Sequence, residues 1–322
     1  MSKGTALARN LTILSGLSLV TLHVLNRLET TDACSETRSS SREDKEYAWR
    51  YGTIRYKVKG YDSPILLLHD LNIGSNKYEY NLIYESLSKN HRVYVPDLLG
   101  YGESDKHPMT YSASVYKDML ADFIKNMIKT KTKVIATGSA APIIIDLAYS
   151  NPKLIDSIVM INPLGLYDQN LIPSTETRIL KVLMDVPIIG TYMYNLRAKK
   201  TNIENLFKTR YLFDPDSMNA EVLDKTIAEY YRAAHVGGLH AKYSYSSYIS
   251  QYMTCSVLND LRHLDNSMLI IGGEHEPDIK DNIENYTYYN AAIESTIIPG
   301  TAHLPHVEKP SEVLDALEVF FS

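Results

Sequence analysis

The sequence predicts an α/β fold in which a doubly wound, mostly parallel sheet is interrupted by one long helical insertion. Three observations support this fold class. Short, continuously apolar runs such as Ile65 to Leu68 are typical of strands in a parallel sheet that is covered on both faces. Segments with helical periodicity alternate with these runs. The alternation then stops between Asn170 and Leu261, where the periodicity is helical throughout.

Size and charge limit the classes of function. The chain has 322 residues and a mass of 36.5 kDa, which is enough for one large domain with an insertion. Its net charge is -5 and its pI is about 6.1, without a long basic run, so no nucleic-acid partner is expected. Cys34 and Cys255 are too few for a disulfide framework, and Glu274-His275-Glu276 lacks further ligands. We therefore expect neither a metal nor a cofactor.

Residues 1–28 predict a signal-anchor-like helix that would tether the protein to a membrane. Lys3 and Arg9 precede an apolar run from Leu11 to Leu25. This run is short and polar for a full span, which needs about 20 apolar residues. A cleaved signal and a soluble helix packed on the domain therefore remain alternatives. The flanking charges place the domain on the extracytoplasmic side, although Arg27 weakens this bias.

A polar linker is expected at residues 29–46, because this stretch is rich in Ser, Thr and charged residues and has no apolar period. The globular domain then covers residues 47–322. Tyr51 to Lys59 alternates like a half-exposed strand. The buried parallel strands that we expect are Ile65 to Leu68, Val93 to Val95, Val134 to Ala136, Ile158 to Ile161, Met268 to Ile271 and Thr296 to Ile298.

Helices are expected on both faces of this sheet. Apolar residues recur at spacings of three and four in Tyr111 to Ile128, and Pro310 to Phe321 begins with proline, as a closing helix often does. The insertion at about 167–262 is predicted to form a helical lid, because a segment of that length with its own periodicity is no simple linker. His235 and His240 in this insertion are candidates for lining a pocket.

The central feature is the stretch from Val134 to Ala148, which predicts a buried strand, a tight turn of tiny residues and a helix. If the register is counted back from Asn151-Pro152, Gly138 lies at the apex of the turn, with Ala136 and Ala140 in the flanking small positions. A register shifted by one residue would place Ser139 at the apex, between Thr137 and Ala141. The two registers have different consequences for chemistry.

Four motifs in this order resemble the α/β-hydrolase superfamily, especially its lidded esterase, dehalogenase and epoxide-hydrolase branch. They are LLLHD after the first buried strand, DLLGYGESD after the next, the elbow just described, and GGEHEP followed by TAHLPHVEKP near the end. The resemblance covers Tyr51 to Ser322 and implies an α/β-hydrolase fold with a helical lid. It implies that His303 is the general base and Glu276 the acid that orients it. It further implies that the oxyanion hole uses the backbone N–H of Leu71 and of the residue after the nucleophile, within an elbow formed by Gly138 and Ala140.

The sequence departs from the pattern of this family at two positions. Gly138 at the nucleophile position cannot attack a substrate, and Asp70 replaces the usual glycine after His69. An Asp carboxylate would repel a developing oxyanion unless it turns outward and caps a loop. Neither Gly138 nor Ser139 supplies the carboxylate of a dehalogenase-type nucleophile. The sequence thus resembles a membrane-anchored member with a degenerate nucleophile elbow.

Three functions stay open from the sequence. The first is hydrolysis of a small apolar or acyl substrate by Ser139, His303 and Glu276. The second is a catalytically degenerate, membrane-tethered binding or scaffold protein. The third is non-covalent acid/base chemistry by His303 and Glu276. We expect His303 to lie within hydrogen-bond distance of Glu276. A one-residue shift turns a helical side chain by about 100°, so we expect Ser139 Oγ to lie out of reach of His303.

Overall fold

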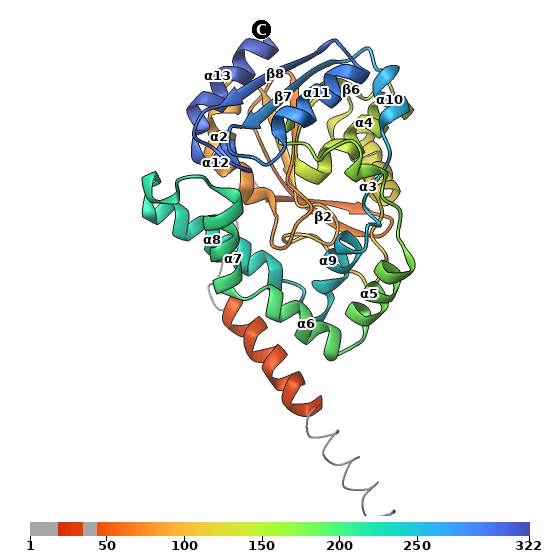
Figure 1. Cartoon of the computed structure of the whole chain (residues 1–322), viewed down its shortest axis with the longest axis vertical. Coiled ribbons are helices and arrows are strands. Elements are labelled where there is room, and N and C mark those ends of the chain that lie inside the picture. Colours follow the sequence, from red (N-terminus) through yellow and green to blue (C-terminus); the bar gives the residue numbers. More distant parts are fainter. Residues whose placement is uncertain (1–18, 35–43) are drawn as a thin grey trace, which may run out of the picture.

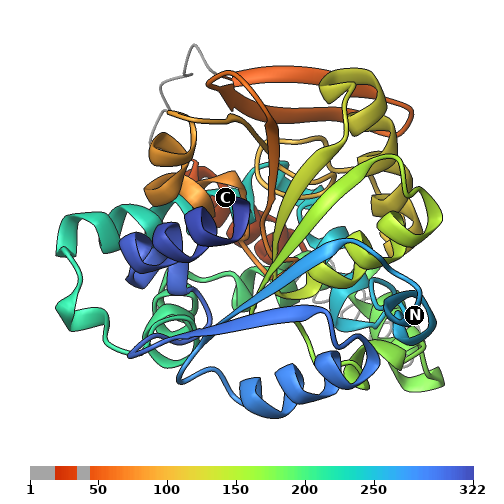
Figure 2. The same ribbon diagram turned by 90° about the horizontal axis from the view of Figure 1, so that it is seen from above.

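The computed structural model describes residues 19–34 and 44–322. Within these residues, eight strands form one sheet in the order β1-β2-β4-β3-β5-β6-β7-β8. Strands β4, β3, β5, β6, β7 and β8 run parallel to one another, whereas β1 and β2 form an antiparallel edge. The predicted α/β fold, with its doubly wound and mostly parallel sheet, is therefore confirmed. Figure 2 shows the strands crossing the molecule between layers of helices.

All six predicted parallel strands are present. The strands are β1 (Asp44–Trp49), β2 (Gly52–Lys59), β3 (Pro64–Leu68), β4 (Arg92–Pro96), β5 (Thr132–Thr137), β6 (Ile155–Ile161), β7 (Ser267–Gly273) and β8 (Ile293–Ile298). Strand β1 was missed, because a polar edge strand has no buried apolar face to give it a pattern. Trp49 is its one buried residue, and the indole N–H donates to Asp122 Oδ2 at 2.9 Å.

The core has two layers, one on each face of the sheet. Alternate residues of β3 face opposite layers: Ile65 and Leu67 join one apolar cluster, and Leu66 and Leu68 join the other. Helices α3 and α4 cover one face, and α2 and α13 cover the other. The helices are α2 (Asn81–Leu87), α3 (Ala113–Phe123), α4 (Ala141–Ser150), α5 (Thr175–Asp185), α6 (Ile189–Arg197), α7 (Lys200–Leu206), α8 (Ala220–His235), α9 (Lys242–Ile249), α10 (Leu258–Arg262), α11 (Ile279–Tyr289), α12 (Pro305–Glu308) and α13 (Pro310–Phe321).

The stretch predicted as a helical insertion does contain a run of helices, from α5 to α10, between β6 and β7. Helices α5 to α9 gather at one end of the molecule (Figure 1). They build an apolar cluster of their own around Phe207, Tyr211 and Tyr230, which meets the sheet domain at Leu304. We refer to residues 167–262 as the helical segment.

The N-terminal region differs from the prediction. Residues 19–33 form a helix, here called the N-terminal helix, so residues 29–33 are not part of a polar linker. Residues 44–46 of the predicted linker belong to strand β1. Asn26 explains why the helix stays ordered beyond residue 28: its amide donates to the Ile188 carbonyl at 3.0 Å and accepts from Asn195 at 3.1 Å.

Most of the predicted signal-anchor-like helix, residues 1–18, lies outside the described residues. Of the helices that are described, none is long and apolar enough to span a bilayer. The N-terminal helix packs on the helical segment instead, with Ala33 in the same apolar cluster as Tyr231. Figure 1 shows it leaving the molecule at the end formed by α6 and α7.

Candidate active site

The elbow after β5 has Gly138 at its apex. Its φ is +54°, in the left-handed region that favours glycine, whereas Ser139 already belongs to the short 3-10 turn η3 (Gly138–Ala140) that leads into α4. Ala140 and Ala141 are buried at 2% and 0% exposure, so only tiny side chains fit beneath the turn. The register counted back from Asn151-Pro152 is therefore the observed one.

Ser139 makes no hydrogen bond to His303 among the described residues. Its backbone N–H donates to Asp70 Oδ1 at 2.9 Å. Its Oγ is buried and has no hydrogen-bond partner among the described residues, so the predicted lack of a Ser139–His303 hydrogen bond is confirmed. The serine thus contributes its backbone rather than its hydroxyl to the hydrogen bonds of this site.

The two expected oxyanion donors converge on one point, but a carboxylate already occupies it. Leu71 N–H donates to Asp70 Oδ1 at 2.7 Å, beside the bond from Ser139 N–H. Asp70 is 4% exposed, so it turns inward and does not cap an outer loop, as one alternative from the sequence had it. The reason is physical: two converging N–H groups in a buried place attract an anion.

Asp70 also explains the glycine at the apex. A Cβ atom on Gly138 would lie 2.6 Å from Asp70 Oδ1 and 2.8 Å from its Cγ. The carboxylate therefore takes the space that the side chain of an elbow nucleophile would need. A carboxylate from the loop after β3 therefore lies where the elbow has no side chain.

His303 lies between two carboxylates. Its Nδ1 is 3.2 Å from Glu276 Oε1, and its Nε2 is 3.4 Å from Asp70 Oδ2. The predicted contact with Glu276 is therefore present, whereas the contact with Asp70 was not expected. All three side chains are nearly buried, with His303 5% exposed.

The charges of this triad depend on one another. Burial alone would lower the pKa of His303, but hydrogen bonding to Asp70 and Glu276 and their negative charges raise it to about 10. Burial would raise the pKa of Asp70, but the bonds from His303, Ser139 and Leu71 lower it below its usual value. At neutral pH the centre is an imidazolium held between carboxylates.

Neighbouring elements fix the position of His303. Asn162, at the end of β6 with φ +42°, donates from Nδ2 to the carbonyls of Ala302 and His303 at 2.9 and 2.8 Å. The Tyr211 ring, from the helical segment, stacks on the imidazole with centroids 5.3 Å apart. Arg210 Nη2 lies 3.0 Å from Glu276 Oε1. The helical segment therefore contacts the site directly.

A second buried layer lies behind Asp70. Glu79 Oε2 accepts from Tyr230 Oη at 2.9 Å and from Asp70 N–H at 3.3 Å, and its Oε1 is 3.6 Å from His306 Nε2. His306 also stacks on Tyr80. The predicted structural role of His306, which ties loops together, agrees with these contacts. The Glu79 link was missed because nothing in the sequence near residue 79 marks a buried carboxylate.

His69 has a structural role as well. Its Nε2 accepts from Leu98 N–H at 3.0 Å, so the ring proton must sit on Nδ1, which donates to the Asp70 carbonyl at 2.6 Å. This bond fixes the backbone of residue 70 just beyond the carboxyl end of β3. Its orientation brings the Asp70 side chain toward the oxyanion donors.

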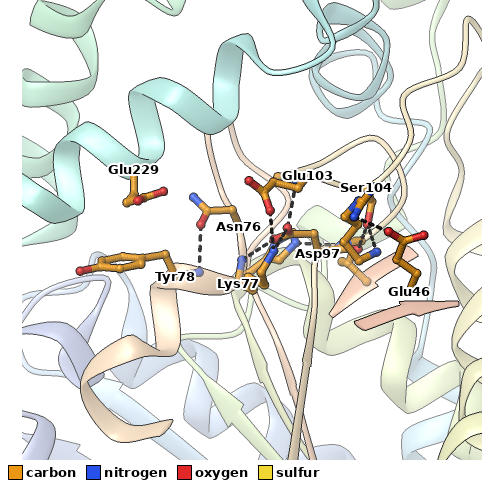
Figure 3. A network of polar contacts seen from close by, with 12 residues as sticks. Glu46, Asn76, Lys77, Tyr78, Asp97, Glu103, Ser104 and Glu229 are labelled. Atoms are coloured by element: carbon orange, nitrogen blue, oxygen red, sulfur yellow. Dashed lines mark hydrogen bonds and ion pairs between the residues drawn. The ribbon is translucent and has the colours of Figure 1, made fainter. Parts of the chain in front are cut away.

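A charged network lies beside the site, at the ends of β3 and β4. Lys77 is buried with its Nζ 2.6 Å from Asp97 Oδ2 and 3.4 Å from Glu103 Oε2, as Figure 3 shows. Arg232, on α8, pairs with Glu103 at 3.0 Å. Burial would raise the pKa of Asp97, but the charge of Lys77 and the hydrogen bonds from Lys77 and from the Glu103 N–H lower it to about 2. This network joins the helical segment to the sheet.

The two pocket candidates lie elsewhere. His235 ends α8 and is buried, and its Nδ1 bonds to the Tyr231 carbonyl at 2.8 Å. The charges that reach it are those of Glu29 and Asp32 on the N-terminal helix. His240 is exposed beside Tyr243. Neither histidine is hydrogen-bonded to His303 or Asp70, and no cluster suited to a metal ion occurs in residues 19–34 and 44–322.

Comparisons with known proteins agree with this geometry. The profile of the Alpha/beta hydrolase family matches residues 65–316. An uncharacterised protein of Mycobacterium tuberculosis is 27% identical over 111 residues, 34% of this chain and 32% of that protein, so the match spans about a third of its length. The Arabidopsis thaliana protein VTE7, an alpha/beta hydrolase domain-containing protein, is 23% identical over 81% of this chain and 74% of its own length.

A solved structure gives the same fold. A serine hydrolase involved in carbazole degradation superposes with a TM-score of 0.69 at 17% identity, covering 86% of this chain and 98% of its own. The profile match covers most of the chain, and the sheet, the elbow and the histidine loop stand in the order that this family uses. The protein is a member of the alpha/beta hydrolase family.

Proposed function

We propose that the protein hydrolyses a small apolar molecule, with His303 as the group that moves the proton and Glu276 as its orienting carboxylate. The observation that carries this proposal is the place of the His303 ring. It lies between Glu276, at 3.2 Å, and the point where the Leu71 and Ser139 N–H groups converge. Proton transfer and oxyanion stabilisation are the two functions that hydrolysis requires at one point.

Hydrolysis by a Ser139-His303-Glu276 arrangement is the less favoured form of this proposal. Ser139 Oγ has no bond to His303, and Asp70 stands between the imidazole and the elbow. A serine-directed fluorophosphonate is expected to leave the protein unlabelled. Strong labelling that is lost in Ser139→Ala would restore the serine mechanism.

The helical segment supports a small apolar substrate rather than a large polar one. Tyr211 and Tyr248 extend from it toward the triad, and the charge of Asp70 acts on both hydroxyl groups. Burial and that charge raise the pKa of Tyr248 to about 12, so the phenol stays neutral. We propose that the segment serves as a lid over the reacting group.

The test compares His303→Gln with His263→Gln, a histidine at the far end of the helical segment whose Nδ1 only bonds the Asn259 carbonyl. Turnover of p-nitrophenyl butyrate, styrene oxide and hexyl bromide would be measured for each full-length variant. Activity toward at least one probe is expected in the wild type and in His263→Gln, and its loss in His303→Gln. Wild-type inactivity toward all three would favour the alternative of a catalytically degenerate binding or scaffold protein.

Association with a membrane is a second proposal, supported by exposed apolar side chains. Val20 and Leu28 of the N-terminal helix are 62% and 61% exposed, and Ile179 and Val182 of α5 are 56% and 66% exposed. Residues 1–28 would then tether the domain, on the extracytoplasmic side, with this apolar surface against the bilayer. Flotation of the full-length protein with phosphatidylcholine vesicles is expected and should weaken in a Val20→Glu/Leu28→Glu variant. Unchanged flotation of that variant would contradict the role of the N-terminal helix.

A further inference from the structure

We propose that Asp70 is a carboxylate nucleophile, supplied from the loop after β3 instead of from the elbow. Its substrates would be small apolar molecules in which a saturated carbon carries a leaving group, such as an epoxide or an alkyl halide. The inference rests on the proposed function, because it uses His303 as the proton-transferring group. It also reverses the sequence-based expectation that no carboxylate reaches the nucleophile position.

The two oxygens of Asp70 have different surroundings. Oδ1 accepts two backbone N–H bonds, from Leu71 at 2.7 Å and from Ser139 at 2.9 Å. Oδ2 makes no bond to the backbone and faces His303 Nε2 at 3.4 Å. A carboxylate that served only to neutralise His303 would not need one oxygen held in the oxyanion hole. The division suits a nucleophile whose Oδ1 becomes a carbonyl oxygen while Oδ2 forms the new bond.

The space around the carboxylate agrees with this assignment. A Cβ on Gly138 would lie 2.6 Å from Oδ1 and 3.2 Å from Oδ2, so Asp70 reaches the place where an elbow side chain would react. The His69 Nδ1 bond to the Asp70 carbonyl and the Glu79 bond to its N–H fix the backbone from which it extends. The nucleophile is therefore held from both sides, as a reacting group requires.

The first step forms an ester. An electron pair on Oδ2 attacks the electrophilic carbon, and the bond from that carbon to its leaving group breaks. A halide leaves with the bonding electrons as the anion. An epoxide oxygen stays attached to the opened molecule and takes a proton from His303, which is protonated at neutral pH. The product is an alkyl ester of Asp70 whose carbonyl oxygen, Oδ1, keeps its two N–H donors.

The second step hydrolyses this ester. Neutral His303 takes a proton from a water molecule that attacks Asp70 Cγ. With an epoxide the imidazole became neutral in the first step; with a halide the imidazolium first releases its proton to solvent, once esterification has removed the negative charge of Asp70. The negative charge that develops on Oδ1 is stabilised by the Leu71 and Ser139 N–H groups. The intermediate then collapses and the alcohol oxygen leaves with the proton from His303. The Asp70 carboxylic acid that results gives its proton to His303, which regenerates the carboxylate and the imidazolium. One water is consumed, and no oxidant, reductant or cofactor is needed.

The lining of the site fits an uncharged substrate. The Tyr211 ring stacks on His303, and the Tyr211 hydroxyl is buried without a hydrogen-bond partner among the described residues. Such a donor can bond the oxygen of an epoxide as its negative charge develops. An anionic substrate would instead be repelled, because Asp70 and Glu276 already flank the imidazole.

The test uses the path of oxygen atoms in the wild-type, full-length protein, so it does not depend on a variant that folds. Excess enzyme would react once with styrene oxide or hexyl bromide in water carrying heavy oxygen. Mass spectrometry is expected to find the heavy oxygen in the peptide that contains Asp70, while the first product molecules carry ordinary oxygen. Heavy oxygen that enters the product alone would overturn the inference, because water would then attack the substrate directly.

The second part of the test uses variants. In His303→Gln the ester should persist, so the intact mass should rise by one alkyl group, located at Asp70. Asp70→Asn, alone or combined with His303→Gln, should show neither this adduct nor turnover of the two probes, whereas Asp156→Asn, at an exposed position, should turn over both probes like the wild type. If the wild type turns over none of the three probes, both the proposed function and this inference are overturned. If His303-dependent turnover of p-nitrophenyl butyrate occurs without heavy oxygen or an adduct at Asp70, the assignment of Asp70 as nucleophile is overturned and the proposed function stands.

Discussion

At the scale of single residues, Gly138 and Asp70 form a complementary pair. The glycine lacks the side chain that the elbow of this family uses, and the carboxylate fills the vacated space, 2.6 Å from where a Cβ would stand. Neither residue is informative alone, because glycine is common in turns and Asp in loops. Together they place a negative charge between two N–H donors and an imidazolium.

This pairing predicts that Gly138→Ser alone is unfavourable. The new Cβ would collide with the Asp70 carboxylate and the φ of +54° would be strained, so we expect a loss of roughly 1–3 kcal/mol in the free energy of unfolding. The variant should not react with a fluorophosphonate. Asp70→Gly combined with Gly138→Ser should regain stability and become labelled. Labelling of the single variant equal to that of the double would contradict the steric argument.

The raised pKa of His303 predicts a dependence of stability on pH. A group protonated more readily in the folded state stabilises fully below its unfolded pKa of about 6.5. This contribution is lost as the pH rises through about 10, the pKa in the folded protein. Wild-type unfolding by urea should therefore become easier between pH 7 and pH 10. Asp70→Asn, which removes one of the two carboxylates, should show a smaller decline over the same interval; an equal decline would show that His303 does not cause it.

At the scale of elements, buried ion pairs join the ends of strands to the turns around them. Lys77, in the short 3-10 turn η1 (Lys77–Tyr80), is 4% exposed and reaches Asp97 after β4 and Glu103 beyond it. Its backbone N–H also donates to Asp97 Oδ1 at 2.7 Å. The turn that carries Glu79, behind Asp70, is thereby fixed to the sheet.

Removing this lysine should destabilise the protein strongly. Lys77→Met leaves the buried Asp97 carboxylate without its cation, at a cost of roughly 3–5 kcal/mol. The double variant Lys77→Met/Asp97→Asn should recover a large part of that loss, because no buried charge then stays unpaired. Lys59→Met, in a pair with Glu85 that is exposed on both sides, is the matched control and should change stability by less than about 1 kcal/mol. Thermal and urea unfolding would measure all three variants.

At the scale of the whole molecule, most of the helical segment packs in one apolar cluster, which also takes in Leu304 and Val307 of the sheet domain. Its last part, with Met253, Val257 and Leu261, packs in a cluster of the sheet. Polar contacts join the segment to the sheet domain around the triad, among them Arg210 with Glu276, Arg232 with Glu103 and Tyr230 with Glu79, and the Tyr211 ring stacks on His303. Asp70 and His303 are nearly buried, so entry of the proposed substrate would require the segment to move. A substrate site that opens in this way belongs to the less stable part of a fold.

Hydrogen exchange should reveal this difference. Amides of α5 to α7 are expected to exchange faster than those of β5 and β6, and Arg210→Ala should speed exchange in η5 (Phe207–Tyr211) further, without changing the sheet. Lys208→Ala, in the same turn but without a contact to the triad among the described residues, is the comparison. Uniform protection across the segment and the sheet would contradict a mobile cover.

The sequence by itself determined the fold, the six parallel strands, the elbow and the pairing of His303 with Glu276. Apolar periodicity and the order of motifs are local properties, and a sheet covered on both faces accepts few arrangements of them. The edge strand β1 and the docking of the N-terminal helix could not be predicted from the sequence, because both depend on distant partners such as Asp122 and Ile188.

Only the tertiary structure decided the position of the Asp70 side chain. A carboxylate after His69 can turn toward solvent or toward the sheet, and the difference depends on N–H groups of Leu71 and Ser139, one of them 69 residues away in the chain. The same holds for Arg210 and Tyr211, which reach the triad from a separate segment. Contacts between elements far apart in sequence leave no local pattern, so the chemistry of this centre follows from packing.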